Sequence, residues 1–363
     1  MTHRTQGVTR TVAFVGPLPP PLHGFSAACA AMLALLQKRG TVAVFDRSPR
    51  VKGRAPQVLR QLREAIRYFH TVRLIPDTGL YLGLCGGLGQ VIDGLYVLIA
   101  RAYRRRIFVH HHSFAYINKS TLTSKLLFSL LRDATHIVLS HGMGSALADR
   151  YKIDSRTIKV VSNAAFYGPP PDIARTQSDV KTPIRIGFLA NITFAKGFIE
   201  FFEVLMELGR LAVPYRAYIA GPISPNARST FDRLMAAAEQ VDYVGPLYDD
   251  AKLRFYQQLD ILLFPTKYVN EAEPLVIHEA IRSGVHVIAC ARGAIPELLS
   301  HGAGLVFDQR VFVTSAATSI RSLSSDRAGL ARAQQLSFEQ AQRLQPSAEA
   351  HLTEVIGQIL GAV

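Results

Sequence analysis

Residues 270–289 read NEAEPLVIHEAIRSGVHVIA, and they contain a loop, a helix and a strand in that order. The loop follows an apolar strand predicted at 261–264. The helical pattern begins at Pro274, because a proline at the first helical position has no intrahelical hydrogen bond to lose. Gly284 follows the helix, and the apolar run 286–289 predicts the next strand. A strand, a loop, a helix and a second strand in succession indicate a parallel βαβ unit.

The same alternation extends along the whole chain. In the first half we predict helices at 26–38, 57–69 and 121–131 and strands at 11–15, 42–45, 80–84, 107–110, 136–139 and 159–161. In the second half we predict strands at 184–189, 216–220, 243–245, 261–264, 286–289 and 305–307. The chain is therefore expected to form an α/β protein with two doubly wound, Rossmann-like domains that face each other across a cleft.

A change of composition separates the two halves. Gly168 and three prolines, at 169 to 171, open a polar stretch that ends at Pro183, which is typical of a linker. A chain of 363 residues also exceeds the size of one core. We predict an N-terminal domain over 1–168, a linker over 169–183, a C-terminal domain over 184–345, and a C-terminal helix over 346–363 that can pack back on either domain.

Charge is distributed unevenly between the halves. Residues 1–170 hold 23 Lys and Arg against 7 Asp and Glu, a net of +16, and the remainder holds 18 against 20, a net of −2. Such a field favours an anionic partner, which can be phospholipid headgroups, a phosphorylated acceptor or nucleic acid. Cys29, Cys85 and Cys290 are far apart and lack paired spacing, which argues against a disulfide framework or a zinc site and fits a reducing cytoplasm.

The helix predicted after Pro274 can bind an anion at its start. The N–H groups of Leu275 and Val276 have no intrahelical partner there, and the aligned peptides add a partial positive charge of roughly +0.5. Glu271 in the preceding loop and Glu279 within the helix can accept hydrogen bonds from sugar hydroxyls at two parts of one elongated ligand. The alternative is that these acids merely favour the helix start and face solvent.

Two glutamates eight positions apart, followed by an alanine and then Gly284 with Val287, Ile288 and Ala289, resemble the donor-site motif of the family 4 retaining glycosyltransferases, which have the GT-B fold. The likeness continues upstream through Tyr256 and Asp260 and downstream to Pro296 and Glu297. It implies a C-terminal domain that binds a nucleotide-diphosphate sugar and an N-terminal domain that binds the acceptor. It also implies that Glu271 contacts the transferred sugar and Glu279 the ribose.

The run IGFLANITFAKG at 186–197 is the second chemical signal. Lys196 and Gly197 open a helical pattern after a strand, where an ammonium group and backbone amides can bind phosphate. The run resembles the family's loop whose Arg and Lys stabilise the departing diphosphate, and this implies a catalytic Lys196. Asn191 occupies the position of the family's Arg and can donate one hydrogen bond, so the chain departs from the pattern here.

In the first half, the loop GPLPPPLHG at 16–24 follows a strand, and Gly24 lets the backbone approach a ligand closely. It resembles the family's glycine-rich loop, with one glycine in place of two. Three histidines, His110, His111 and His112, end a strand. The resemblance implies that one of them faces the donor sugar, and we favour His111. Neighbouring strand residues point to opposite faces, so the three do not converge on a metal ion, and no metal or other cofactor is expected.

The stretch 47–73 interleaves arginines with Val58, Leu59, Leu62, Ile66 and Phe69. As a helix it has an apolar stripe with a cationic flank, which suits an anionic membrane surface. The alternative is an ordinary helix that packs its stripe on the sheet. The apolar run 82–100 is interrupted by glycines and Asp93, so no segment is predicted to span a bilayer. The predicted membrane or acceptor surface consists of Arg54, Arg60, Arg63, Arg67, Arg104 and Arg105.

Together these features predict a cytoplasmic, metal-independent, retaining glycosyltransferase. It moves a sugar from a nucleotide-diphosphate sugar to a hydroxyl acceptor, for which we expect a lipid-linked saccharide or glycolipid of cell-surface polysaccharide synthesis at the inner face of the membrane. Three rivals stay open: a nucleotide-sugar epimerase of the same fold, an inactive sugar-nucleotide binder, and a nucleic-acid-binding protein. No nucleic-acid-binding motif supports the last, and we expect no nucleic-acid partner.

Overall fold

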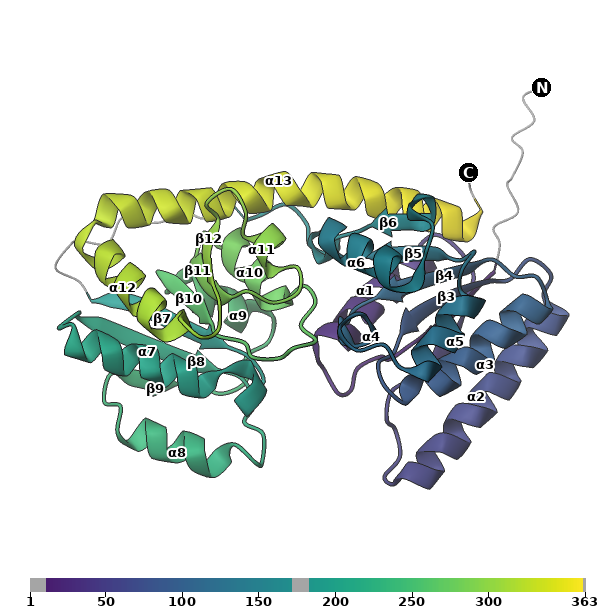
Figure 1. The fold of residues 1–363 in the computed structure, drawn as a ribbon, viewed down its shortest axis with the longest axis horizontal. Coiled ribbons are helices and arrows are strands. Elements are labelled where there is room, and N and C mark those ends of the chain that lie inside the picture. Colours follow the sequence, from purple (N-terminus) through teal and green to yellow (C-terminus); the bar gives the residue numbers. More distant parts are fainter. Residues whose placement is uncertain (1–10, 172–182, 362–363) are drawn as a thin grey trace. The chain divides into compact units, whose positions relative to one another are not determined.

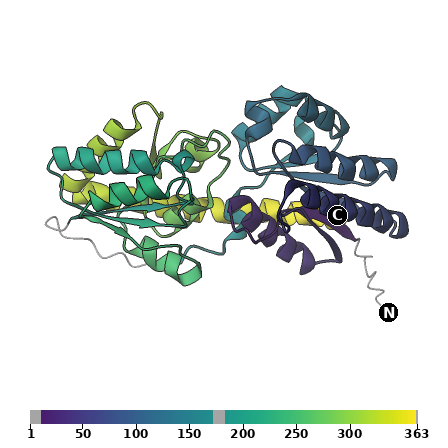
Figure 2. The same ribbon diagram turned by 90° about the horizontal axis from the view of Figure 1, so that it is seen from below.

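Each half of the chain contains a six-stranded parallel sheet in the computed structural model, which describes residues 11–171 and 183–361 (Figure 1). All twelve predicted strands are present, and their ends lie within two residues of the prediction. The strands are rich in Val, Ile, Leu and Phe and mostly buried, because helices cover both faces of each sheet (Figure 2). The two predicted doubly wound α/β sheets are thus confirmed.

The first sheet has the strand order β2-β1-β3-β4-β5-β6. Its strands are β1 (Val12–Gly16), β2 (Val42–Asp46), β3 (Gly79–Leu84), β4 (Ile107–His111), β5 (Thr135–Val138) and β6 (Ile158–Val160). The helices of this part are α1 (Gly24–Gln37), α2 (Arg54–Leu74), α3 (Gly89–Ala102), α4 (Ala115–Asn118), α5 (Leu122–Leu130) and α6 (His141–Tyr151), with short 3-10 turns η1 (Ser155–Thr157) and η2 (Asn163–Phe166).

The second sheet has the order β12-β11-β10-β7-β8-β9. Its strands are β7 (Ile184–Leu189), β8 (Tyr215–Ala220), β9 (Val241–Tyr243), β10 (Ile261–Phe264), β11 (His286–Cys290) and β12 (Gly304–Phe307). The helical elements are η3 (Phe194–Lys196), α7 (Phe198–Arg210), α8 (Arg228–Ala236), α9 (Asp249–Gln257), α10 (Leu275–Arg282), α11 (Ile295–Leu298), α12 (Phe312–Ser325) and α13 (Arg327–Leu360).

The chain divides into two compact units. One takes in the residues up to Phe166 together with those from Ser347 onward, and the other runs from Tyr167 to Pro346. We call them the N-terminal and the C-terminal unit. Of the linker predicted over 169–183, residues 172–182 lie outside the described residues.

The last helix differs from the prediction of a helix over 346–363. Helix α13 begins at Arg327 and continues past Pro346, which lies inside it. A proline costs one backbone hydrogen bond but ends a helix only when nothing else supports it. Here the residues beyond Pro346 pack on the N-terminal unit: Arg106 donates to the carbonyl oxygens of Gln358 and Ile359, and Lys159 pairs with Glu354.

A buried acid fixes the two strands that carry the C-terminal loops of interest. Asp260, 2% exposed, accepts hydrogen bonds from the backbone N–H and the guanidinium of Arg185, at 2.8 Å each. Hydrogen bonding to this carboxylate raises the pKa of Arg185 despite partial burial. The contact joins the start of β10 to the start of β7, which are neighbours in the sheet. Because both strands run in the same direction, the loops that follow them leave the same edge of the sheet.

Candidate functional site

The loops after β7 and β10 are joined by an ion pair. The ammonium of Lys196 lies 2.5 Å from a carboxylate oxygen of Glu271, and the hydroxyl of Thr266 donates to the same oxygen at 3.1 Å. Both charged side chains are largely shielded from water. Lys196 also lies over the rings of Phe264 and Tyr268, which can stabilise its charge. Two residues that the sequence placed 75 positions apart thus form one charged centre.

Two glycines, one after β7 and one after β11, allow close approach to the loop that follows β10. Gly197 has φ +82°, and a Cβ there would lie 2.0 Å from the carbonyl oxygen of Pro265. Gly293 has φ +50°, and a Cβ there would lie 2.2 Å from the carbonyl oxygen of Glu271. Any side chain at either position would therefore push the loop that carries Glu271 away.

Glu279 on α10 is held by three donors of its own. Lys252 contacts one carboxylate oxygen at 2.5 Å, Tyr256 the other at 2.9 Å, and the hydroxyl of Tyr167 lies 3.4 Å from the first. Burial and the adjacent Glu279 raise the pKa of both tyrosines, so both stay protonated donors. The two carboxylates thus have separate sets of partners and do not pair with each other's lysine.

The start of α10 differs slightly from the prediction. Pro274 is the N-cap and Leu275 the first helical residue, so the proline lies one position earlier than expected. The reason is that the backbone of Pro274 is extended, with ψ 124°, which is typical of an N-cap residue and not of a residue within a helix. The N–H groups of Leu275 and Val276 remain in the first turn, where they have no intrahelical acceptor. Asn191, which the sequence also predicts to bind the nucleotide sugar, is exposed in the loop after β7.

Sequence reasoning missed the residues that support these acids. Lys252 and Tyr256 are four positions apart and therefore on one face of α9. That spacing was visible in the sequence, but nothing local shows that this face meets Glu279. No local pattern predicts the roles of Thr266 and Tyr167. Thr266 reaches Glu271 because of the path of the loop after β10, and Tyr167 reaches Glu279 because of the path of the chain before β7.

In the N-terminal unit, Gly24 is the first residue of α1, as the predicted loop requires. A Cβ on Gly24 would meet no atom within 4 Å, so the space before the helix is open. The cap is His23, whose ring accepts a hydrogen bond from the N–H of Ser26.

His111 does not face this loop, which corrects the choice among the three histidines. Its ring is fully buried: Nδ1 accepts from the hydroxyl of Tyr116 at 2.8 Å, and Nε2 donates to His136 Nδ1 at 3.0 Å. His136 in turn donates through Nε2 to the carbonyl oxygen of Leu131, and this fixes the tautomers of the chain. Strand alternation places His111 on the opposite face of β4 from His110 and His112, and both faces of this strand are buried.

His112 is the histidine that lies beside the loop. Its ring centroid is 5.0 Å from that of Phe25, the residue after Gly24, and 4.0 Å from that of His110. Its Nε2 is buried without a hydrogen-bond partner among the described residues. The hydroxyl of Tyr81 lies 2.6 Å from Nδ1 of His110. A buried ring nitrogen left unpaired at a strand end is available to a ligand.

The six arginines predicted as a membrane or acceptor surface divide into two groups. Arg60, Arg67 and Arg105 donate to backbone carbonyls of their own unit. Arg54, Arg63 and Arg104 are exposed. The first group therefore also stabilises the fold, and the second is available to a partner.

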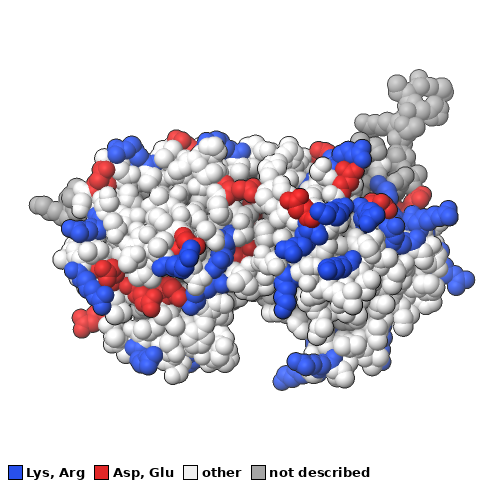
Figure 3. Space-filling model, in the orientation of Figure 1, with Lys and Arg blue, Asp and Glu red and all other residues white. Residues whose placement is uncertain are grey.

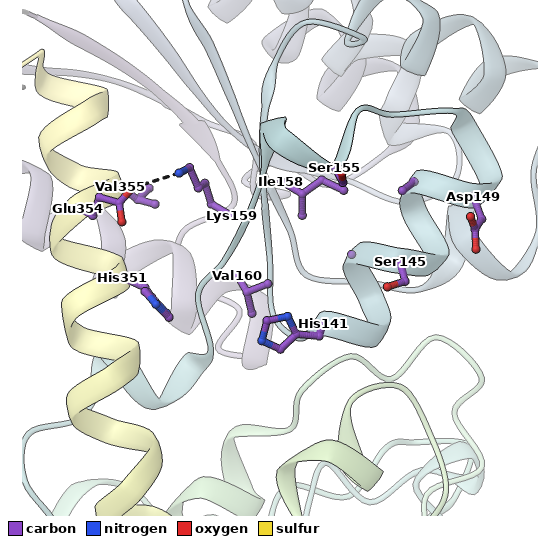
Figure 4. A pocket seen from close by; sticks show the side chains of 12 residues that line it. His141, Ser145, Asp149, Ser155, Ile158, Lys159, Val160, His351, Glu354 and Val355 are labelled. Atoms are coloured by element: carbon purple, nitrogen blue, oxygen red, sulfur yellow. Dashed lines mark hydrogen bonds and ion pairs between the residues drawn. The ribbon is translucent and has the colours of Figure 1, made fainter.

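A separate cavity of about 530 Å³ lies in the N-terminal unit between α6, β6 and the end of α13 (Figure 4). His141 and His351 point into it from two helices, and Lys159 pairs with Glu354 at its rim. None of the residues predicted from the sequence lines this cavity.

The buried histidines predict acid sensitivity. Burial lowers the pKa of His136 to about 4 and that of His112 to about 3, and it lowers the pKa of His111 as well. An unfolded histidine titrates near 6.5, so between pH 6.5 and about 4 the unfolded chain binds protons that the native state does not. The free energy of unfolding should fall as the pH falls through this window. It should be unaffected by these groups above it.

Urea unfolding between pH 7.5 and 4.5 measures this slope. His136→Gln should reduce it by up to about 1.4 kcal/mol per pH unit. Equal slopes in wild type and His136→Gln would contradict the assignment of a neutral, buried His136.

Comparison with known proteins finds one family model that matches part of the chain and several solved structures of similar fold. Residues 172–344 match the family model described as "Glycosyl transferases group 1". No curated protein matches the sequence significantly. Among solved structures, Alr3699/HepE from Anabaena, in complex with UDP, has 17% identity and a TM-score of 0.70, with 96% of this chain and 100% of that chain covered. The same protein has also been solved with UDP-glucose.

Two further structures are similar over their full length. The lipopolysaccharide outer core galactosyltransferase WaaB has 14% identity and a TM-score of 0.69, with 97% and 100% of the two chains covered. The sucrose-phosphate synthase of Thermosynechococcus elongatus has 16% identity and a TM-score of 0.67, with 98% and 100% covered. At such identities the likeness establishes the fold.

Proposed function

Because this chain belongs to the group 1 (family 4) glycosyltransferases, a family of retaining enzymes that use nucleotide sugars, we propose that its C-terminal unit binds a nucleotide-diphosphate sugar through Lys196, Glu271, Glu279 and the start of α10. The observation that carries the proposal is the Lys196–Glu271 pair at 2.5 Å, because Glu271 lies in the loop that leads into that helix. An ammonium and free amides suit a diphosphate, and carboxylates suit hydroxyls.

In this proposal each group has its own task. Lys196 and the amides of Leu275 and Val276 stabilise negative charge on the departing diphosphate, with Asn191 adding one donor. Glu271 orients the transferred sugar, and Glu279, held by Lys252 and Tyr256, accepts from the ribose hydroxyls. Because charge develops on the leaving group during glycosyl transfer, donors positioned there lower the barrier most. Gly197 belongs to the same site through the close approach of its loop.

His112, in place of His111, is proposed to contact the donor sugar together with the loop at Gly24. Nε2 is buried without a partner among the described residues in both His110 and His112, whereas both nitrogens of His111 are used within the core. His112 is chosen over His110 because its ring lies beside Phe25, the residue after Gly24. His112→Asn should lower turnover at least tenfold, while His111→Asn should chiefly lower thermal stability. Equal loss of turnover in two equally stable variants would contradict the exchange of roles.

The acceptor is proposed to be a hydroxyl of a lipid-linked saccharide or glycolipid, held at the basic N-terminal unit on an anionic membrane surface. The support is the net charge of +16 over residues 1–170 and the exposure of Arg54, Arg63 and Arg104. Each cation near such a surface contributes on the order of 1 kcal/mol. No helix among the described residues has the length and apolar character needed to cross a bilayer.

Replacing Lys196 by Ala tests the role of the ammonium. We expect kcat to fall by about 10²–10³-fold, or roughly 2.7–4 kcal/mol, since one leaving-group donor is lost. Lys267→Ala is the matched control, because Lys267 forms a similar ion pair with Glu200 at 2.6 Å in the same unit. Normal turnover of Lys196→Ala with UDP-sugar donors would rule out this role.

Replacing Glu279 by Gln tests the proposed ribose contact. We expect a rise in donor KM of about tenfold or more, since hydrogen bonds to charged groups contribute about 1.5–3 kcal/mol, with a smaller change in kcat. Donor binding is measured by thermal shift with a panel of nucleotide sugars that begins with UDP-sugars, with and without chelator. An unchanged KM would remove Glu279 from the donor site.

Product analysis separates transfer from its rivals. A transferase releases free nucleotide diphosphate in step with glycosylated acceptor, whereas an epimerase converts the sugar nucleotide without acceptor. Binding without either product would indicate an inactive sugar-nucleotide binder.

A further inference from the structure

Helix α3 turns an uncharged side to solvent. Its one charged residue between Gly89 and Ala100 is Asp93, which is fully buried and pairs with Arg47. On the outer side, Val91 is 53% exposed and Leu98 50%, and Leu88 just before the helix is 89% exposed. A surface helix normally carries polar residues on this side, so an apolar outer side indicates a partner.

Helix α2 has a second exposed apolar stripe. Its buried residues are Gln61, Ala65, Tyr68 and Val72. The stripe that the sequence showed is exposed instead, so the interpretation that it packs on the sheet is wrong. At about 3.6 residues per turn, Tyr68 and Val72 lie on the side of the helix that faces inward. The apolar stripe lies about a quarter-turn around the helix axis from that side. The exposed residues are Val58, Leu59, Leu62, Ile66 and Phe69.

These exposed side chains belong to neighbouring helices. Helix α3 packs between α2 and α5 (Figure 1). The ring of Phe69, from the stripe, contacts that of Tyr103 at the end of α3, with centroids 5.9 Å apart. On α5, Leu122 and Leu126 are exposed. We call the exposed apolar residues of α2, α3 and α5, with Leu88, the apolar face.

Positive charge borders the apolar face. Arg54 and Arg63 are exposed on α2, Arg104 follows α3, and Lys125 is exposed on α5. The nearby acids are already paired, Glu64 with Arg67 and Asp133 with Arg101. Figure 3 shows the surface over α3 and α5 as largely uncharged, with Lys and Arg around it.

We infer that the apolar face inserts into the interfacial layer of an anionic lipid bilayer, with its basic border on the headgroups. The inference rests on the membrane-linked acceptor proposed above. It differs in that apolar side chains enter the lipid layer, whereas the proposed function requires only electrostatic adsorption of the basic unit. Helix α3 has 14 residues, about 21 Å of helix, and so lies in the membrane plane rather than across it. Charge complementarity selects lipid over a second copy of the chain, since two copies would bring two basic borders together.

Vesicle flotation tests the inference with the full-length protein. The probes are vesicles of phosphatidylglycerol with phosphatidylcholine, and vesicles of phosphatidylcholine alone, at low salt and at about 1 M NaCl, where the screening length is about 3 Å. Wild type should bind the anionic vesicles and keep part of this binding at high salt, since insertion is not screened.

Three variants separate insertion from adsorption. Leu62→Ser/Ile66→Ser and Val91→Ser/Leu98→Ser should each lower high-salt binding at least tenfold. Arg54→Gln/Arg63→Gln should weaken low-salt binding only. Met206→Ser/Val311→Ser, two similarly exposed apolar residues of the C-terminal unit, is the matched control and should bind as wild type.

Three outcomes would overturn the inference. The first is high-salt binding of the apolar variants equal to that of wild type, and the second is no vesicle binding by wild type. The third is a dimer seen by light scattering that dissociates in the same variants, which would assign the apolar face to a second copy. Thermal shift with nucleotide sugars should be the same in all variants, so failure of insertion is distinguishable from failure of the donor site.

Discussion

The parallel pairing of β7 with β10 is the constraint on which the candidate site depends. It is fixed by the backbone ladder and by Asp260, which accepts from both the N–H and the guanidinium of Arg185. Two parallel neighbours release their loops at one edge, so Lys196 and Glu271 meet although many residues separate them. Gly197 and Gly293 then permit contacts that any Cβ would prevent. The ion pair is therefore a consequence of sheet order and of two glycines.

This arrangement places two lysines and two glutamates where a ligand that has both phosphate and hydroxyl groups can bind. Lys196 is paired with Glu271 and Lys252 with Glu279, so the described site is close to neutral before a ligand enters. A donor that brings both a diphosphate and hydroxyls can take over contacts from each partner: phosphates from the ammonium groups, hydroxyls from the carboxylates. The tyrosines that share Glu279 keep that acid oriented meanwhile, because burial holds them protonated.

The N-terminal unit combines a buried polar network with outer helices that expose apolar side chains. Its buried histidine chain, from Tyr116 through His111 and His136 to Leu131, is a satisfied core network rather than a site. Its outer helices instead leave apolar side chains exposed near arginines. A membrane-linked acceptor would explain why a unit with a well-buried core still exposes leucines on three adjacent helices, since the lipid interface takes the place of packing.

The sequence by itself determined the twelve strands, the α/β class and the residues that carry the family's motif, because strand periodicity, turn residues and the spacing of two glutamates are local properties. The tertiary structure alone decided the partners. Whether His111 or His112 is free depends on which side of β4 meets α1, and whether the stripe of α2 is buried depends on which side Tyr68 turns inward. The same holds for Lys252 and Tyr256 at Glu279. Such choices depend on contacts between distant segments, and no local pattern encodes them.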